Sequence, residues 1–216
     1  EGLTPSMLLN FVLGMLQERK RLLSRFGFLL LPVVLFVAFV VLNGSIVVGD
    51  HANHKAVSHW AQLAYLSAAT VSMWGILGPQ AGLSLASLKA FAAGCFGGVR
   101  AAVATILALS GTLYLLHRYS FAHPFLLADN RHYTFYIWSR FLGRVPGLKE
   151  ALAPVYVYAA WVCGQRLSSS QSGIWFLIWC VACVLTLVPA HLLEPRYWTV
   201  ALIMAHAHGP EQTWGA

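Results

Sequence analysis

The sequence predicts an all-α membrane protein, a bundle of about five to six transmembrane helices in one domain covering residues 1–216. Hydrophobic residues make up 58% of the chain and charged residues only 10%, whereas a soluble domain carries about 25% charged residues. The mean hydropathy is +0.67. Long apolar runs alternate with polar connections, and most runs approach the roughly 20 residues that cross a bilayer.

The apolar runs define the expected helices in order. The predicted spans are 26–42, about 60–77, 101–116, 151–163 and 173–188. The segment 80–99 is rich in small residues, and its role is ambiguous. A short apolar stretch, 198–205, precedes a polar tail.

The polar connections divide unequally between the two sides of the expected bundle. If 80–99 does not cross, then 43–59, 117–150 and 190–197 share one side. That side holds seven of the nine histidines and the acids Asp50, Asp129, Glu150 and Glu194. The opposite connections hold no acid and no histidine. A functional site is therefore expected on the polar side.

The net charge of +7 suits membrane headgroups better than nucleic acid, because the basic residues are scattered between apolar runs. A basic cluster at 19–25 is typical of a cytoplasmic end under the positive-inside rule, which makes the polar side lumenal. The sequon at Asn43 agrees with that orientation. Lysine and arginine divide equally between the two sides, so the rule alone leaves the orientation open.

The segment 123–138 is the most informative motif. Four consecutive polar residues, Asp129, Asn130, Arg131 and His132, stand between apolar and aromatic runs. At about 100° per residue on a helix they point all round the barrel, so they cannot all face lipid. Polar groups at membrane depth usually have a partner or a task.

Two interpretations of this motif remain open. In the functional one, Arg131 and His132 bind a phosphate, Asp129 accepts a proton, and nearby aromatic side chains stack on a sugar. Those aromatic residues are Tyr133, Tyr136 and Trp138. In the structural one, Asp129 and Arg131 pair to fix the loop, and the aromatic rings lie at the headgroups.

Two further clusters carry weaker signals. Asp50 with His51 and His54 resembles a metal-ligand set, but a solvated loop or a helix cap explains it better. Glu194 and Arg196 beside the last apolar stretch predict either an ion pair or part of a polar cavity. No nucleotide-binding or nucleophile motif is present, and we expect neither a metal nor a cofactor.

The string LADNRHYTFYIW at 127–138 closely resembles the α-1,2-glucosyltransferases of asparagine-linked glycosylation. Further similar segments follow in the same order, over roughly 26–200. They are NGSIVVGD at 43–50 with His54, APVY at 153–156, LVP at 187–189 and LLEPRY at 192–197. Pro195 stands where the family usually has an aromatic residue.

The resemblance implies an enzyme of the multi-span GT-C glycosyltransferase type in the endoplasmic reticulum membrane, with a lumenal active face. Its implied reaction transfers glucose from dolichyl phosphate glucose, in α-1,2 linkage, to the diglucosylated dolichyl-pyrophosphate oligosaccharide. The chain would be the C-terminal part of a longer enzyme. The implied acidic candidates are Asp129, Asp50 and Glu194. The implied substrate-binding residues are Asn130, Arg131, His132, Tyr133, Tyr136, Trp138, His54 and Arg196.

Two other functions stay open. A transporter or channel-like bundle also explains buried charge, but it predicts polar residues distributed through the spans. Here the spans are nearly free of charge and the polar groups gather between them, which favours a surface active site. A non-catalytic remnant of the enzyme, binding lipid or a partner, is the second alternative.

Overall fold

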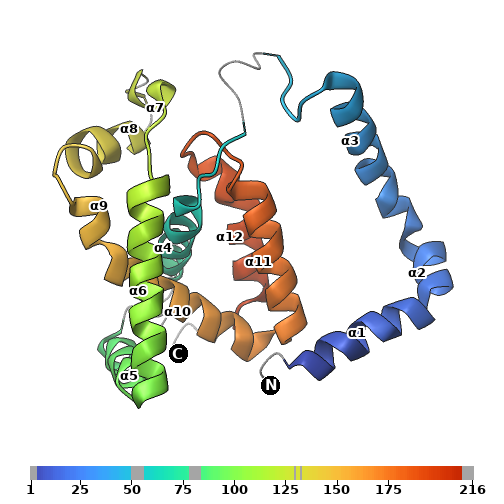
Figure 1. Ribbon diagram of the computed structural model, residues 1–216, viewed down its shortest axis with the longest axis horizontal. Coiled ribbons are helices and arrows are strands. Elements are labelled where there is room, and N and C mark those ends of the chain that lie inside the picture. Colours follow the sequence, from blue (N-terminus) through green and yellow to red (C-terminus); the bar gives the residue numbers. More distant parts are fainter. Residues whose placement is uncertain (1–3, 50–55, 78–83, 129, 132, 211–216) are drawn as a thin grey trace. The chain divides into compact units, whose positions relative to one another are not determined.

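The structure is a computed structural model that describes residues 4–49, 56–77, 84–128, 130–131 and 133–210 (Figure 1). Those residues form helices joined by turns and loops, and they contain no strand. The all-α prediction is therefore confirmed. Contacts within the chain separate it into two compact units, Glu1–Ala56 and Val57–Ala216.

The first unit is a run of helices with exposed apolar side chains. It contains α1 (Pro5–Gln17), α2 (Arg19–Phe26), a 3-10 turn η1 (Gly27–Leu29) and α3 (Leu30–Asn43). Gly44 ends α3 with φ of 69°, a left-handed conformation that glycine adopts without steric cost. The Asn43 side chain closes the same turn by donating to the carbonyl oxygens of Ser45 and Val47, at 2.8 and 2.7 Å.

The second unit holds the remaining helices. In chain order they are α4 (Ala61–Leu77), α5 (Leu85–Cys95), α6 (Val99–Tyr119), α7 (Pro124–Ala128), α8 (Tyr133–Ile137), the π-helical η2 (Trp138–Leu142), α9 (Leu148–Ala151), α10 (Ala153–Ser170), α11 (Gly173–Leu187), the 3-10 turn η3 (Pro195–Trp198) and α12 (Thr199–His208).

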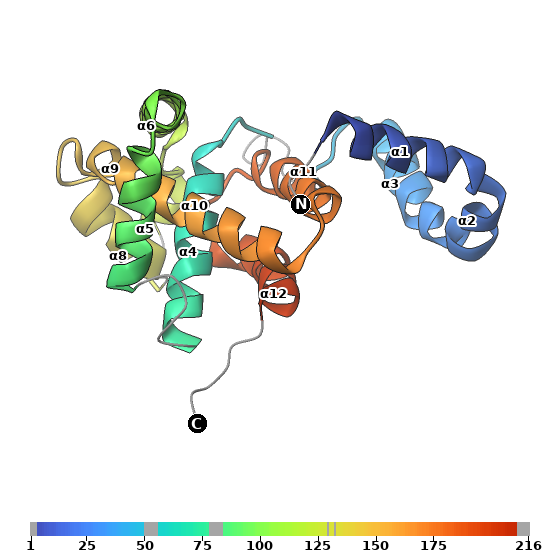
Figure 2. The ribbon, with the colours of Figure 1, turned by 90° about the horizontal axis from the view of Figure 1, so that it is seen from below.

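Helices α4 and α10 form the centre of the second unit. Helix α4 packs against α6, α10, α11 and α12, and Figure 2 shows α10 between α6 and α11. In the main core cluster, Val71 and Trp74 of α4 meet Val162 and Leu167 of α10. The buried positions on α10 recur every three or four residues, which is the spacing of one helix face.

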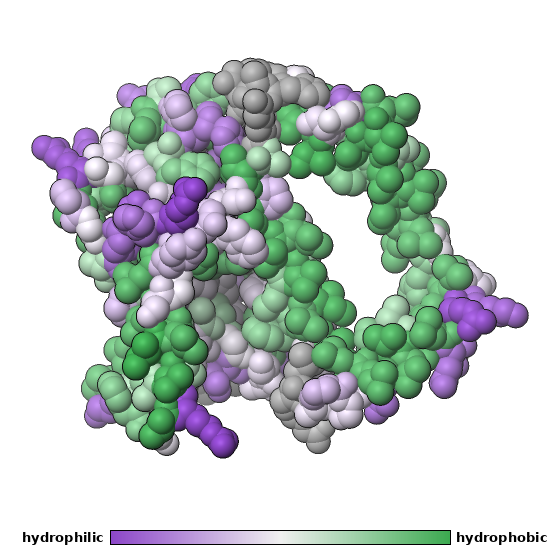
Figure 3. All heavy atoms as spheres, viewed as in Figure 1, coloured by the Kyte–Doolittle hydropathy of each residue, from purple (hydrophilic) through white to green (hydrophobic). Residues whose placement is uncertain are grey.

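The described parts of the three polar connections that belong to the second unit meet at one of its ends. The backbone N–H groups of Val57 and His59, before α4, donate to the carbonyls of Pro189 and Val188, after α11, at 3.3 and 2.9 Å. The ring of His59 also stacks on Phe121, after α6, with centroids 4.4 Å apart. In Figure 3, hydrophobic surface covers α11 and the lower part of α6, while hydrophilic residues gather near α7.

Two helical stretches within the described residues are long and apolar enough to cross a membrane. They are Arg19–Asn43, with 25 residues, and Val99–Tyr119, with 21 residues. They contain the predicted spans 26–42 and 101–116. Helix α5 occupies part of the ambiguous segment 80–99. Its 11 residues give a length of about 16 Å, which is about half of a bilayer's hydrocarbon core.

Candidate functional site

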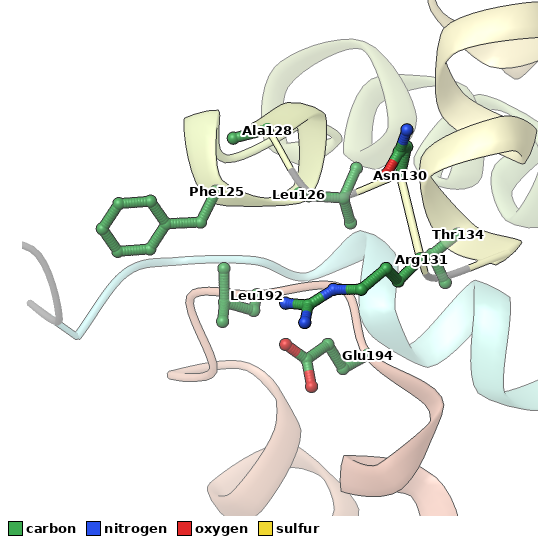
Figure 4. A pocket seen from close by; sticks show the side chains of 8 residues that line it. All are labelled: Phe125, Leu126, Ala128, Asn130, Arg131, Thr134, Leu192 and Glu194. Atoms are coloured by element: carbon green, nitrogen blue, oxygen red, sulfur yellow. The ribbon is translucent and has the colours of Figure 1, made fainter.

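A pocket of about 530 Å³ opens at the polar end of the second unit. Helix α7, the turn that follows it and the start of α8 form one wall, and the segment between α11 and η3 forms the other (Figure 4). The lining residues are Phe125, Leu126, Ala128, Asn130, Arg131, Thr134, Leu192 and Glu194. Its size is within the usual range for a small-molecule site.

Helix α7 is fixed beside the pocket by its own N-terminal turn. Pro124 occupies the first helical position, where the missing N–H costs no hydrogen bond. His123 accepts the Phe125 N–H through Nδ1 at 3.2 Å. The His123 carbonyl accepts the Leu126 N–H at 3.0 Å. Leu126 packs in the core and also lines the pocket, together with Phe125 and Ala128 of the same helix.

Gln62 of α4 holds the opposite wall. This side chain is completely buried. Its Nε2 donates to the Leu192 carbonyl at 2.9 Å, and its Oε1 accepts from the Trp198 indole N–H at 3.0 Å. One amide therefore fixes both ends of the segment that carries Glu194. Sequence analysis missed Gln62, although an amide inside the apolar run after residue 60 was the available signal.

The pocket's charged groups converge on Glu194. Its carboxylate forms an ion pair with Arg196 Nε, and the Glu194 side chain is 23% exposed while that of Arg196 is 70% exposed. Figure 4 shows the Arg131 guanidinium pointing across the pocket toward the same carboxylate. Among the residues that the structure describes here, two guanidinium groups thus accompany one carboxylate, a net positive set that suits an anionic ligand.

Three histidines lie beside the pocket. The rings of His123 and His191 are 4.0 Å apart. His59 is buried, and neither of its ring nitrogens makes a hydrogen bond of normal geometry within the described residues. Burial lowers the pKa of His59 to about 4; the Ala190 carbonyl opposes this shift, and His191 adds to it. His59 is therefore neutral near pH 7 and braces the polar end by stacking.

A second polar network lies beneath the histidines, where α4, α6 and α9 meet. The hydroxyl groups of Tyr65 and Ser120 are hydrogen-bonded. Lys149 Nζ donates to the Ser120 carbonyl at 3.3 Å. Glu150 lies 3.7 Å from Lys149 Nζ and 3.5 Å from His117 Nδ1. Because Glu150 faces the Lys149 ammonium and the His117 ring, we interpret the network as a structural support.

The structure brings some of the predicted site residues together. Asn130, Arg131 and Glu194 line the pocket, and Arg196 pairs with Glu194 at its edge. Asn130 and Arg131 belong to one segment, and Glu194 and Arg196 belong to another that lies more than 60 residues further along the chain.

The predicted aromatic residues lie elsewhere. Tyr133 and Tyr136 are exposed on α8 and are not among the pocket-lining residues. The Arg140 guanidinium lies 5.1 Å from the Tyr136 ring centroid. Trp138 is buried in a core cluster with Tyr65 and Leu126. Four other predicted residues, Asp50, His54, Asp129 and His132, lie outside the described residues.

Comparison with known proteins identifies relatives over most of the chain. A model of the DIE2/ALG10 family matches residues 4–207. A human protein named Dol-P-Glc:Glc(2)Man(9)GlcNAc(2)-PP-Dol alpha-1,2-glucosyltransferase is 36% identical over 173 residues, which is 79% of this chain and 34% of the relative.

Proteins with the same name from two other animals extend the match. The mouse protein is 34% identical over 204 residues, covering 94% of this chain and 41% of the relative. The Drosophila melanogaster protein is 36% identical over 203 residues, covering 93% and 41%. The chain thus spans about two fifths or less of these relatives. No solved structure matches it.

Proposed function

The chain belongs to the DIE2/ALG10 family, and from that membership we propose that it carries part of the active site of a dolichyl-phosphate-glucose-dependent α-1,2-glucosyltransferase. The enzyme transfers glucose to the diglucosylated dolichyl-pyrophosphate oligosaccharide used for protein N-glycosylation. The names of the relatives contain this donor, this acceptor and this linkage.

One observation carries the proposal for this chain's own residues. Arg131 and Glu194 line one pocket, and Arg196 pairs with Glu194 at its edge. A donor joined to its lipid through a phosphate needs cationic groups at the point where the sugar leaves. Guanidinium groups suit that task because they form charge-assisted hydrogen bonds with phosphate oxygens in a fixed geometry.

The reaction then follows from the charges. The acceptor hydroxyl oxygen attacks C1 of the donor glucose, the bond between C1 and the phosphate oxygen breaks, and dolichyl phosphate leaves. A β-linked donor that gives an α-linked product requires this displacement to occur in line, with inversion. Arg131 and Arg196 stabilise the charge that develops on the departing phosphate, in the way that preorganised donors stabilise other oxyanions.

A carboxylate takes the proton of the acceptor hydroxyl. We propose Asp50, Asp129 and Glu194 as the candidates. Glu194 is the one of these three among the described residues. Its engagement with Arg196 favours a second role for it, which is to orient the guanidinium. Asn130, His132, Tyr133, Tyr136, Trp138 and His54 remain proposed substrate-binding residues.

Both proposed substrates carry long lipids, so the site must lie at a membrane face. We propose a GT-C type bundle of about five to six spans in the endoplasmic reticulum membrane, acting as one transmembrane domain with its polar end lumenal. The apolar character of Arg19–Asn43 and Val99–Tyr119 supports membrane insertion. The gathering of polar connections at one end supports a single active face.

The experiment that tests this proposal measures glucose transfer by Arg131→Ala in microsomes supplied with dolichyl phosphate glucose and the diglucosylated acceptor. Losing charged hydrogen bonds to the phosphate should lower kcat/KM roughly 10- to 100-fold. Arg118→Ala is the matched control, because Arg118 is exposed at the end of α6 and its guanidinium lies over the Tyr119 ring at 5.7 Å. If the two variants transfer glucose equally well, Arg131 does not bind the donor phosphate.

A further inference from the structure

A second cavity, an apolar groove of about 410 Å³, lies between α11 and α12. Trp175, Ile178, Ala182 and Thr186 face it from α11, and Val200 and Met204 from α12. Their spacing of three or four residues places each set on one helix face. We call this cavity the α11–α12 groove.

The groove exists because the two helices share a support without packing closely along their outer faces. Cys183 and Leu187 of α11 pack on Leu66 of α4, and Ala201 and Leu202 of α12 pack against the same cluster. Two contacts join the helices: the Trp179 indole N–H donates to the Ala201 carbonyl at 3.4 Å, and the Trp175 ring stacks on the His208 ring with centroids 4.9 Å apart.

The groove wall offers little for a polar ligand. The Thr186 hydroxyl donates to the Ala182 carbonyl of its own helix at 2.7 Å, and the Trp179 N–H is already engaged. The other lining side chains are hydrocarbon, thiol, thioether or indole, apart from the phenol of Tyr197 at the end nearest the polar pocket. A hydrocarbon chain fits such a wall, because no buried polar group has to lose a partner when it binds.

The turn η3 joins the groove to the polar pocket. Glu194 lines the pocket, and Tyr197, three residues later, lines the groove. Arg196 lies between them: it pairs with Glu194, and its guanidinium lies 5.5 Å from the centroid of the Tyr197 ring. A phosphate beside Arg196 would therefore have a sugar-sized pocket on one side and an apolar groove on the other.

The groove also has the length of one membrane leaflet. Along α11 its lining runs from Trp175 to Thr186, a rise of 11 residue steps, which is about 16 Å at 1.5 Å per step. The hydrocarbon core of a bilayer is about 30 Å thick. A lipid tail that starts at the polar end would follow the groove to about the bilayer midplane.

We propose that the α11–α12 groove binds the phosphate-proximal part of the isoprenoid tail of dolichyl phosphate glucose, with the phosphate at Arg196. This assignment rests on the proposed function, because that function supplies the polyisoprenyl phosphate. It adds a lipid subsite on residues that sequence analysis did not select. The groove selects the branched isoprenoid chain, and the pocket selects the glucose.

The test is photo-crosslinking of the full chain in microsomes with a polyprenyl phosphate glucose that carries a diazirine in the isoprene unit next to the phosphate. Label is expected on peptides of α11 and α12. Ala182→Trp fills the groove and should lower labelling about tenfold, the effect of displacing a few methylene groups. Val200→Trp fills the groove from α12 and should lower labelling to the same extent. Val181→Trp is the control, since Val181 is exposed on α11 outside the groove lining.

Competition separates the possible outcomes. Unlabelled dolichyl phosphate glucose should displace the probe, and phosphatidylcholine should not. Label on other helices, or labelling that both groove variants leave unchanged, would overturn the assignment and indicate that a protein segment fills the groove. Equal competition by phosphatidylcholine would overturn isoprenoid selectivity. Groove labelling with no glucose transfer by a chimera in which the chain replaces the matching segment of the mouse relative would instead refute the proposed function and leave the lipid subsite standing.

Discussion

At the scale of single residues, the Gln62 side chain holds the segment that carries Glu194, which forms the second wall of the pocket. Replacing this glutamine in Gln62→Leu leaves the Leu192 carbonyl and the Trp198 N–H without their partners. Each unpaired buried group costs about 1–3 kcal/mol, so we expect a loss of about 2–4 kcal/mol. Thermal unfolding in detergent measures the loss.

Transfer activity should fall with the stability of Gln62→Leu, because Glu194 lies on the released segment. The matched control is Gln165→Leu on α10, where the glutamine is exposed. If both glutamine variants unfold at the wild-type temperature, the two hydrogen bonds do not hold the wall.

His59 should make the protein sensitive to acid. Its pKa is lowered to about 4 in the folded chain from 6.5, so the unfolded chain binds the proton more readily. Stability is unaffected above about pH 6.5 and is lost as the pH falls toward 4, by about 3 kcal/mol in total. His59→Phe keeps the stack on Phe121 and removes the proton site. Its Tm should fall less than the wild-type Tm between pH 7 and pH 4.5, and parallel curves would contradict this.

At the scale of elements, α10 should carry much of the stability of the second unit. Leu167 is completely buried in the core cluster with Trp74 and Ala205. Leu167→Ala should therefore cost about 2–5 kcal/mol. Val155→Ala on the same helix is the control, because Val155 is 51% exposed and should change stability by less than about 1 kcal/mol. Similar losses for both would show that the buried face of α10 is not the core.

The long helices could be predicted from the sequence, but the site's short elements could not. The run at 101–116 carries no charged residue and is mostly apolar, which is enough to place α6 (Val99–Tyr119). Helices α7 and α8 have five residues each, too few for a periodic pattern. They depend on core contacts made by Leu126 of α7 and by Trp138, which follows α8.

In the candidate site, too, single residues could be predicted from the local sequence, but contacts between distant residues could not. Polar residues at membrane depth singled out Arg131, Glu194 and Arg196 in the sequence. Their meeting depends on Gln62, whose partner Leu192 is 130 residues away, and no local pattern encodes that pairing. Aromatic side chains serve cores and binding sites alike, so the sequence could not show that Trp138 packs with Tyr65 and Leu126.

At the scale of the whole molecule, the polar end of the second unit is proposed to face the lumen. Single-cysteine variants at the two ends test this in sealed microsomes, after the four native cysteines are replaced. Leu127→Cys on α7 should react with a membrane-impermeant maleimide only after permeabilisation. Ser169→Cys near the end of α10 should react in intact vesicles. Both wild-type side chains are exposed, and the reverse pattern would invert the proposed orientation.

The most direct measurement of the central proposal is complementation in cells that lack the terminal glucosyltransferase. The chain replaces the matching 204-residue segment of the mouse relative, and the lipid-linked oligosaccharides are profiled. We expect the triglucosylated species to return with the wild-type segment and to fall sharply with Arg131→Ala. Persistence of the diglucosylated species alone, with the chimera present in the membrane at the level of the mouse protein, would contradict a role for these residues in glucose transfer.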